Sequence, residues 1–158
     1  MTEASALDRI DRRILAALQA DGRLSNQALA ERVALSPSAC LVRVRRLEER
    51  GVIRGYHARV DPFALAVGLV IFAEITLKDH RPQELAAFER AIQDIPAIVE
   101  ATHVTGAYDY LLKVAVPDMN AWTKLAEHLT SADLAIERVI THVTMSKPKV
   151  FTGYPVSI

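Results

Sequence analysis

The sequence predicts an α+β protein with two domains, the first all-helical and the second built from alternating strands and helices. Up to about residue 50, apolar side chains recur every three or four positions, which is typical of amphipathic helices. Pro62 and Gly68 then interrupt regular structure in the stretch "DPFALAVG". Beyond it, apolar runs of strand length alternate with helical patterns. We therefore expect domains at residues 1–60 and 69–158, joined by a linker at 61–68.

Three short helices are expected in the first domain, because each has a capping residue ahead of an apolar stripe. The capping residues are Asp8, Ser25 and Ser36. Pro37 strengthens the third signal, since proline is favoured in the first turn of a helix. Gly22 and Gly51 are expected to end the first and third helices. The segment "VIRGYHARV" that follows is expected to be short and extended.

The connection between the second and third expected helices is only about three residues long and includes the small residue Ala34. A connection this tight predicts a helix-turn-helix, in which the second helix of the pair projects from the body and can enter a groove.

The third expected helix concentrates arginine in a chain whose formal net charge is zero. Within eight residues lie Arg43, Arg45, Arg46 and Arg50. The first 61 residues carry eleven arginines against eight acidic residues, so the basic excess lies in the first domain. One explanation is a solvated helix face on which Glu48 and Glu49 supply ion-pair partners. The other is a polyanionic partner, for which double-stranded DNA is the candidate.

Binding in a DNA groove needs exposed side chains for base edges and cations for phosphates. The side of the third helix expected to face the core carries Cys40, Val44 and Leu47. The candidate DNA-binding residues precede this helix, lie opposite that side or flank it: Ser36, Ser38, Leu41, Val42, Arg43, Arg45 and Arg46.

The second domain is expected to contain four strands and two helices in the order β-α-β-β-α-β, which is the ferredoxin-like arrangement. The strands are expected at residues 69–77, 97–105, 108–116 and 136–145, and the helices at 82–95 and 118–130. Helices cover one face of such a sheet, yet Val70, Phe72 and Leu111 place apolar side chains on the other face as well. An apolar face is unsuited to solvent, so we expect a second copy of the chain to bury it.

The four residues Gly106-Ala-Tyr-Asp109 lie between the two middle strands. The simpler interpretation is a hairpin turn, in which Gly106 supplies a positive φ and Asp109 accepts hydrogen bonds from nearby backbone amides. The alternative is a binding site, because backbone N–H groups can hold a carboxylate and Asp109 can hold an ammonium group.

Two stretches resemble one known family. The first, "LDRIDRRILAALQADGRLSNQALAERVALSPSACLVRVRRLEERGVIRGYHARVDP", resembles the DNA-binding half of the Lrp/AsnC, or feast/famine, transcriptional regulators. The second, "VTGAYDYLLKVAVPDM", resembles the G-x-Y-D turn of their effector-sensing half, with Ala107 where many relatives carry an acidic residue. The likeness runs from about Leu7 to Lys149. It implies a winged helix-turn-helix domain followed by a RAM-type ferredoxin-like domain.

The resemblance also implies a function, namely sequence-specific regulation of transcription that responds to a small amino acid. Relatives bind such an effector beside the G-x-Y-D turn, at the contact between two dimers, so the chain itself is an expected partner, as a dimer and as a tetramer of dimers. The candidate effector-binding residues are Gly106, Ala107, Tyr108, Asp109, Thr141 and Thr144.

Other functions have less support in the sequence. Catalysis lacks a phosphate loop, a dinucleotide fingerprint and an activated nucleophile, so neither an enzyme nor a cofactor is expected. An amino-acid sensor without a DNA role would leave the arginine-rich helix unexplained. The five histidines lack ligand spacing, so no metal is expected, although His103 and His142 would be neighbours if their strands paired.

Cys40 and the apolar runs bear on where the protein works. Cys40 is the single cysteine, falls on the core side of its helix and is expected to be a core residue rather than a redox sensor. No apolar run is long enough to span a membrane, and the N-terminal residues do not resemble a signal peptide. We expect a cytoplasmic protein.

Overall fold

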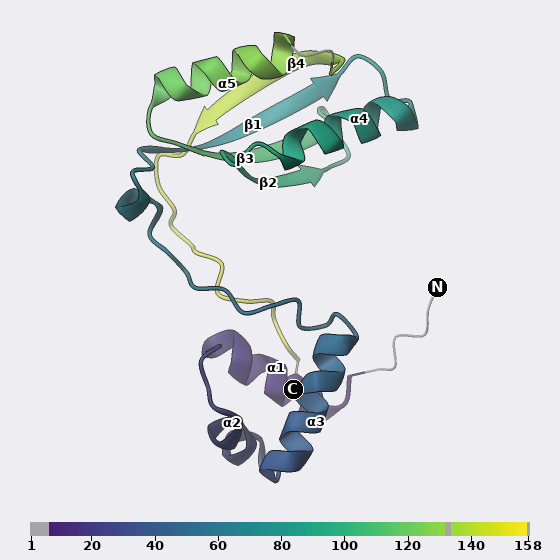
Figure 1. Ribbon diagram of the computed structural model, residues 1–158, viewed down its shortest axis with the longest axis vertical. Helices are drawn as coiled ribbons and strands as arrows, with labels where there is room; N and C mark the ends of the chain where they lie inside the picture. The colour runs from purple at the N-terminus through teal and green to yellow at the C-terminus, as the bar shows by residue number, and fades with distance from the viewer. Residues whose placement is uncertain (1–6, 132–133, 158) are drawn as a thin grey trace. The chain divides into compact units, whose positions relative to one another are not determined.

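A computed structural model describes residues 7–131 and 134–157 (Figure 1). The chain forms two compact units. The first unit contains the residues up to Arg59 together with those from Lys149 onward, and the second contains Val60–Pro148. The C-terminal segment, which we expected in the second domain, therefore belongs with the first unit.

The first unit contains three helices, α1 (Arg9–Ala20), α2 (Asn26–Val33) and α3 (Pro37–Glu49). Each begins at the capping residue that the sequence predicts. Asp8 accepts a hydrogen bond from the amide of Asp11, and Ser25 and Ser36 accept corresponding bonds from residues three positions later. The first and third helices each end two residues before the predicted glycine.

The connection between α2 and α3 is a tight turn, as the sequence predicts. Ala34 has a left-handed backbone, with φ of 59°, and its amide donates to the carbonyl of Glu31. The amide of Leu35 donates to the carbonyl of Ala30, so the last turn of α2 is closed by backbone bonds. The core of this unit consists of side chains from all three helices: Ile14, Ala17, Leu29, Ala30, Val33, Cys40 and Leu47. Residues 54–61 form neither helix nor strand.

The C-terminal segment joins the first unit through hydrogen bonds to α1. The side chain of Gln19 accepts from the amide of Tyr154 at 2.7 Å and donates to the carbonyl of Tyr154 at 3.0 Å. Arg12 donates to the carbonyl of Ser157 at 3.0 Å. The segment has no helix or strand of its own, so periodicity in the sequence gave no indication of this docking.

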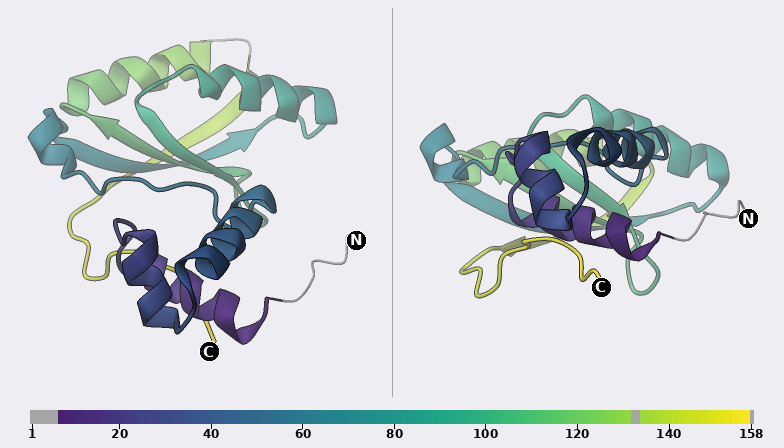
Figure 2. Two further views of the ribbon diagram at one scale, coloured as in Figure 1. Left: turned by 60° about the horizontal axis from the view of Figure 1, so that its bottom comes forward. Right: turned by 90° about the horizontal axis from the view of Figure 1, so that it is seen from below.

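The second unit has the predicted β-α-β-β-α-β order. Its elements are β1 (Leu69–Leu77), α4 (Pro82–Gln93), β2 (Ile98–His103), β3 (Tyr110–Val116), α5 (Met119–Ser131) and β4 (Ile136–Val143). A short 3₁₀ helix, η1 (Pro62–Leu65), lies in the expected linker. The strands form one antiparallel sheet in the order β2-β3-β1-β4, and both helices lie on the same face of it (Figures 1 and 2).

The two faces of the sheet differ in how they are covered. Under α4 and α5, the buried core includes Ile71, Ile75, Phe88, Leu112, Val114, Trp122 and Leu129. The other face, which we call the open face, carries Val70, Phe72, Leu111 and Ala115, which are buried or half-buried, and neither α4 nor α5 lies on it (Figure 2). None of the helices among the described residues has the length and apolar character needed to cross a bilayer.

Candidate functional sites

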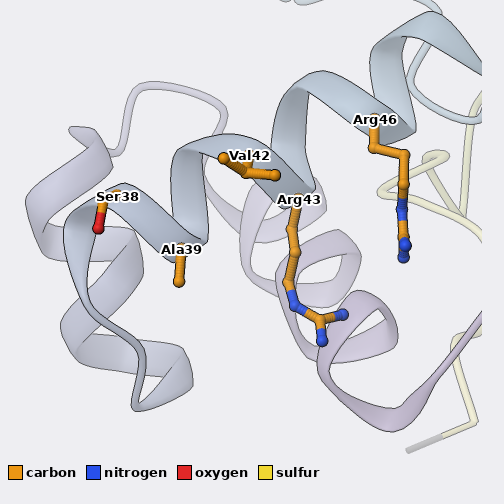
Figure 3. A pocket seen from close by; sticks show the side chains of 5 residues that line it. All are labelled: Ser38, Ala39, Val42, Arg43 and Arg46. Carbon is orange, nitrogen blue, oxygen red and sulfur yellow. The ribbon is translucent and has the colours of Figure 1, made fainter.

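The outer surface of α3 presents the side chains that the sequence predicted to be exposed. Ser38, Leu41, Val42 and Arg45 are exposed, and Val42 retains 66% of its accessible surface. Cys40 and Leu47 are fully buried on the opposite side. A shallow hollow of about 470 Å³ runs along one flank of the helix, lined by Ser38, Ala39, Val42, Arg43 and Arg46 (Figure 3). An apolar side chain exposed among polar ones on a projecting helix is suited to contact with bases.

The arginines of α3 differ in whether they are already bonded to another part of the chain. Arg43 and Arg46 extend to the same side of the helix (Figure 3). Each donates to a different carboxylate oxygen of Asp11, at 2.8 and 2.9 Å. Arg45 is exposed and has no hydrogen-bond or ion-pair partner within the described parts of the chain. It is therefore free to contact a partner without first breaking an internal bond.

Two other residues at this surface have structural roles. Ser36 is the cap of α3, because its hydroxyl accepts from the amide of Ala39 and lies 3.2 Å from the hydroxyl of Ser38. Glu48, which we considered as an ion-pair partner for the arginines, accepts a hydrogen bond from the hydroxyl of Tyr56. Burial and this bond raise the pKa of Tyr56 to about 12.

In the second unit, the segment from Gly106 to Asp109 is a hairpin turn between β2 and β3. Gly106 has a backbone φ of +131°, a conformation that residues other than glycine rarely adopt. The amide of Asp109 donates to the carbonyl of Ile75, and the carbonyl of Asp109 accepts from the amide of Val104. The turn is thus attached to the end of β1 as well as to its own hairpin.

The carboxylate of Asp109 has two partners within the chain. One oxygen accepts from the amide of Leu77 at 2.8 Å, and the other lies 2.9 Å from Nε2 of His80. The side chain of Asp109 is only 16% exposed, whereas that of His80 is 63% exposed. Asp109 therefore has a structural role, but not the one that the hairpin interpretation predicted, because its carboxylate accepts from an amide of β1 rather than from amides of its own turn.

The tip of the turn has unused backbone donors. The amides of residues 105–108 have no acceptor in the described parts of the chain. The carbonyl of Ala107 accepts from the guanidinium of Arg138 at 3.3 Å. A group of free amides beside a guanidinium is suited to a carboxylate. His80 and Arg138 were absent from our candidates, and nothing in the spacing of the sequence places either of them at the turn.

The two threonines predicted to join this turn lie elsewhere in the unit. The hydroxyl of Thr141 accepts from the indole N–H of Trp122 at 3.1 Å, so it faces α5. Thr144 pairs with Val70 at the start of β1, whereas the turn lies at the end of β1. Because β4 is antiparallel to β1, the end of β4 is carried away from the turn, and the chain does not bring these residues together.

His103, His142 and Cys40, which we considered as metal-ligand or redox candidates, have structural contacts. His103 stacks on Tyr110, and His142 lies 3.0 Å from a carboxylate oxygen of Glu74. β2 and β4 form opposite edges of the sheet, so the two histidines are not neighbours. No cluster of potential metal ligands occurs among the residues that the structure describes. Cys40 is buried, and burial raises the pKa of its thiol.

Comparison with known proteins agrees with both halves of this description. Residues 7–54 match the model of a winged helix-turn-helix DNA-binding domain, and residues 70–154 match the Lrp/AsnC ligand binding domain. The leucine-responsive regulatory protein of Escherichia coli K12 is 46% identical over 143 residues, which cover 90% of this chain and 87% of that protein.

The chain belongs to the Lrp/AsnC family.

Solved structures of the family extend the likeness to three dimensions. An AsnC family transcriptional regulator from Agrobacterium tumefaciens is 34% identical and superposes with a TM-score of 0.85, covering 94% of this chain and 96% of its own. A transcriptional regulator from Neisseria meningitidis in complex with L-Met is 32% identical, with a TM-score of 0.87 and coverages of 95% and 97%. As an Lrp/AsnC member, the protein is a DNA-binding transcriptional regulator that responds to an effector.

Proposed function

We propose that the exposed face of α3 binds duplex DNA and that a small amino acid, bound at the turn formed by Gly106–Asp109, changes this binding. The observation that carries the first half is the state of Arg45, which is exposed and unpaired within the described chain on a capped helix-turn-helix. The second half is supported by the free amides of residues 105–108 and by the carboxylate of Asp109.

The exposed residues of α3 have different proposed roles in DNA recognition. Ser38, Leu41 and Val42 are exposed near the start of the helix, where side chains of a recognition helix reach base edges. Arg45, one turn further on, can bind a guanine or a phosphate. Ser36 contributes by fixing the start of the helix, because its hydroxyl is used as the cap.

The effector site is proposed to bind both charged groups of an amino acid. Its α-carboxylate would be held by the free amides of the turn, with Arg138 close by, and its α-ammonium by Asp109, where it takes the place of His80. An amino-acid ligand agrees with the names of two relatives, one of them leucine-responsive and the other solved in complex with L-Met.

The proposal also includes the assembly of the chain into dimers and the association of these dimers. The open face of the sheet is suited to a second copy of the chain, and a dimer would present two α3 helices to two half-sites. We propose that the effector lies where two such dimers meet, so that its binding and their association are coupled. A regulator of this kind would act in the cytoplasm, where it meets chromosomal DNA.

The DNA-binding half is tested with a duplex selected by the protein from a random pool. Arg45→Ala is expected to weaken binding to the selected duplex by about 1–3 kcal/mol if Arg45 contacts a guanine. If Arg45 binds a phosphate instead, the substitution should weaken binding to all sequences alike. Fluorescence anisotropy at several salt concentrations measures this. Arg90→Ala, an exposed arginine of α4, is the control and should leave affinity unchanged. Equal affinities for the Arg45 variant and the wild type would contradict the assignment.

A further inference from the structure

Asp11 stands out because it is charged and lies in the core of the first unit. Among the described residues it is the one charged side chain that is buried, with no exposed surface. A carboxylate removed from water is costly unless cations and donors compensate for it. Asp11 lies in the first turn of α1, where unpaired backbone N–H groups give the helix end a partial positive charge. This charge supplies part of the compensation.

Two arginines of α3 supply the rest. One oxygen of Asp11 accepts from Arg43 at 2.8 Å and the other from Arg46 at 2.9 Å. The same nitrogen of Arg43 also lies 2.6 Å from the carboxylate of Asp8, the cap of α1. These bonds raise the pKa of Arg43, with the bond to Asp8 as the largest cause. Both guanidinium groups are therefore committed to α1.

We infer that Asp11 is a positioning residue for DNA recognition, which fixes Arg43 and Arg46 along the hollow beside α3 and keeps these two cations from binding the phosphates of any sequence. The inference rests on the proposed role of α3. An arginine that binds phosphates strengthens all complexes alike and carries no sequence information. A helix with several free arginines would therefore hold unrelated DNA more tightly, which lowers the ratio of specific to non-specific affinity.

The fixed arginines also define the recognition surface. Arg43 and Arg46 line the hollow together with Ser38, Ala39 and Val42. Two bonds to one buried carboxylate hold both side chains in single conformations, so the shape of the hollow is set before DNA arrives. Arg45, next to Arg46 in the chain, has no such bond in the described structure and remains the adaptable cation.

The first test is Asp11→Asn, which keeps the size of the side chain and removes its charge. Binding is measured over about 50–200 mM salt with the selected duplex and with a scrambled duplex of equal length. Each freed arginine that reaches a phosphate steepens the dependence of log affinity on log salt by about 0.9. We expect a steeper slope on both duplexes, a larger gain on the scrambled one, and thus a lower specificity ratio.

The matched control is Asp8→Asn, which removes the same charge from a half-exposed position and leaves both bonds to Asp11 in place. We expect it to keep the wild-type slope and specificity ratio. If the two variants change binding equally, the effect is one of net charge and the inference is overturned. It is also overturned if Asp11→Asn lowers the melting temperature while slope and ratio stay as in the wild type, since Asp11 would then only clamp α1 to α3.

A second pair of variants keeps Asp11 intact in case Asp11→Asn does not fold. Arg45→Gln should weaken binding to the selected duplex, and it should also reduce the salt slope by about 0.9 if Arg45 binds a phosphate. Arg46→Gln should change neither the affinity nor the slope, because Arg46 binds Asp11 rather than a phosphate. Equal losses of slope would overturn the inference while preserving the role of α3. If wild type binds neither duplex, or Arg45→Gln has no effect on either, the proposed role of α3 fails first and the inference fails with it.

Discussion

At the scale of single residues, the second unit depends on how Asp109 divides its two carboxylate oxygens. One oxygen accepts from the buried amide of Leu77 and the other contacts the exposed imidazole of His80. The first bond belongs to the fold, since an unpaired buried amide is costly. The second can be exchanged for an ammonium group at little structural cost. One oxygen of Asp109 thus maintains the fold, and the other is the one that we propose binds the effector.

Asp109→Asn and Asp109→Ala are expected to separate the two roles. Asparagine retains an oxygen for the amide of Leu77, so the variant should fold as the wild type does and lose the response of DNA binding to the effector. Alanine leaves that amide unpaired and should cost about 1–3 kcal/mol of unfolding free energy as well. Chemical denaturation and anisotropy titrations measure the two effects. A full effector response by Asp109→Asn would show that its charge has no part in binding.

The left-handed backbone of Gly106 gives a second prediction at this scale. Any side chain at φ of +131° is strained, although no atom lies near the position of the added Cβ. Gly106→Ala should therefore lower the unfolding free energy by about 1 kcal/mol or more. Gly22→Ala is the control, because its Cβ would make only ordinary contacts of 3.7 Å. Equal stabilities of the two variants would contradict the importance of the backbone conformation.

At the scale of elements, the C-terminal segment shows how a part without periodicity can still be ordered. Gln19 on α1 uses its amide as both donor and acceptor to the backbone of Tyr154. Gly153, just before, has φ of +134°, and a Cβ there would lie 2.7 Å from the side chain of Gln19. The absence of a side chain at Gly153 is what allows the segment to approach α1.

Gln19→Ala is expected to release this segment, because two hydrogen bonds to its backbone are lost at about 1 kcal/mol each. Hydrogen exchange or limited proteolysis should show faster exchange and cleavage in residues 149–157, with α3 unaffected. Gln27→Ala on α2 is the matched control, since the side chain of Gln27 is exposed and, among the described residues, donates its hydrogen bond to Glu31 on its own helix. Unchanged protection of the segment in the Gln19 variant would mean that other contacts hold it.

The elements themselves could be predicted from the sequence because their signals are local. The caps Asp8, Ser25 and Ser36 lie within three residues of the amides that they bind. Alternation of apolar residues identified the strands, and their order gave the sheet. The exposed face of α3 followed from helical periodicity with Cys40 and Leu47 as the buried side.

Contacts between distant parts of the chain could not be predicted from these local signals. Asp11 meets Arg43 and Arg46 across 32 and 35 positions, so the sequence could not show which arginines are already paired. Thr144 was placed near the turn although the antiparallel register of β4 carries it to the other end of β1. The partners of Asp109 follow from the pairing of β1 with β3, which brings His80 beside the turn.

At the scale of the whole molecule, the open face of the sheet is the surface through which we propose that the chain assembles. Phe72 of β1 pairs with Lys113 of β3 and His142 of β4, so the face mixes apolar side chains with a few charged ones. A dimer that buries this face would bring two copies of α3 into one assembly and let them bind half-sites about one or more helical turns apart. Effector binding that alters association would then alter DNA occupancy.

Phe72→Asp is expected to shift this assembly toward the monomer, because it removes a large apolar side chain from the interface and adds a charge that is costly to take out of water. Sedimentation or light scattering at micromolar concentration measures the change. Thr123→Asp, on the exposed side of α5, is the control and should leave the assembly as in the wild type. A wild-type protein that is already a folded monomer under these conditions would rule out the dimer.

The most direct test of the whole account is the affinity of the protein for its selected duplex, measured by anisotropy at fixed salt with each of the twenty amino acids in turn. We expect at least one amino acid to change this affinity by about 5–150-fold, the usual range of coupling between two sites. Asp109→Asn should abolish the change while binding the duplex normally without effector. If the wild type binds the duplex with the same affinity in the presence of every amino acid, the turn is structural only and the central claim is wrong.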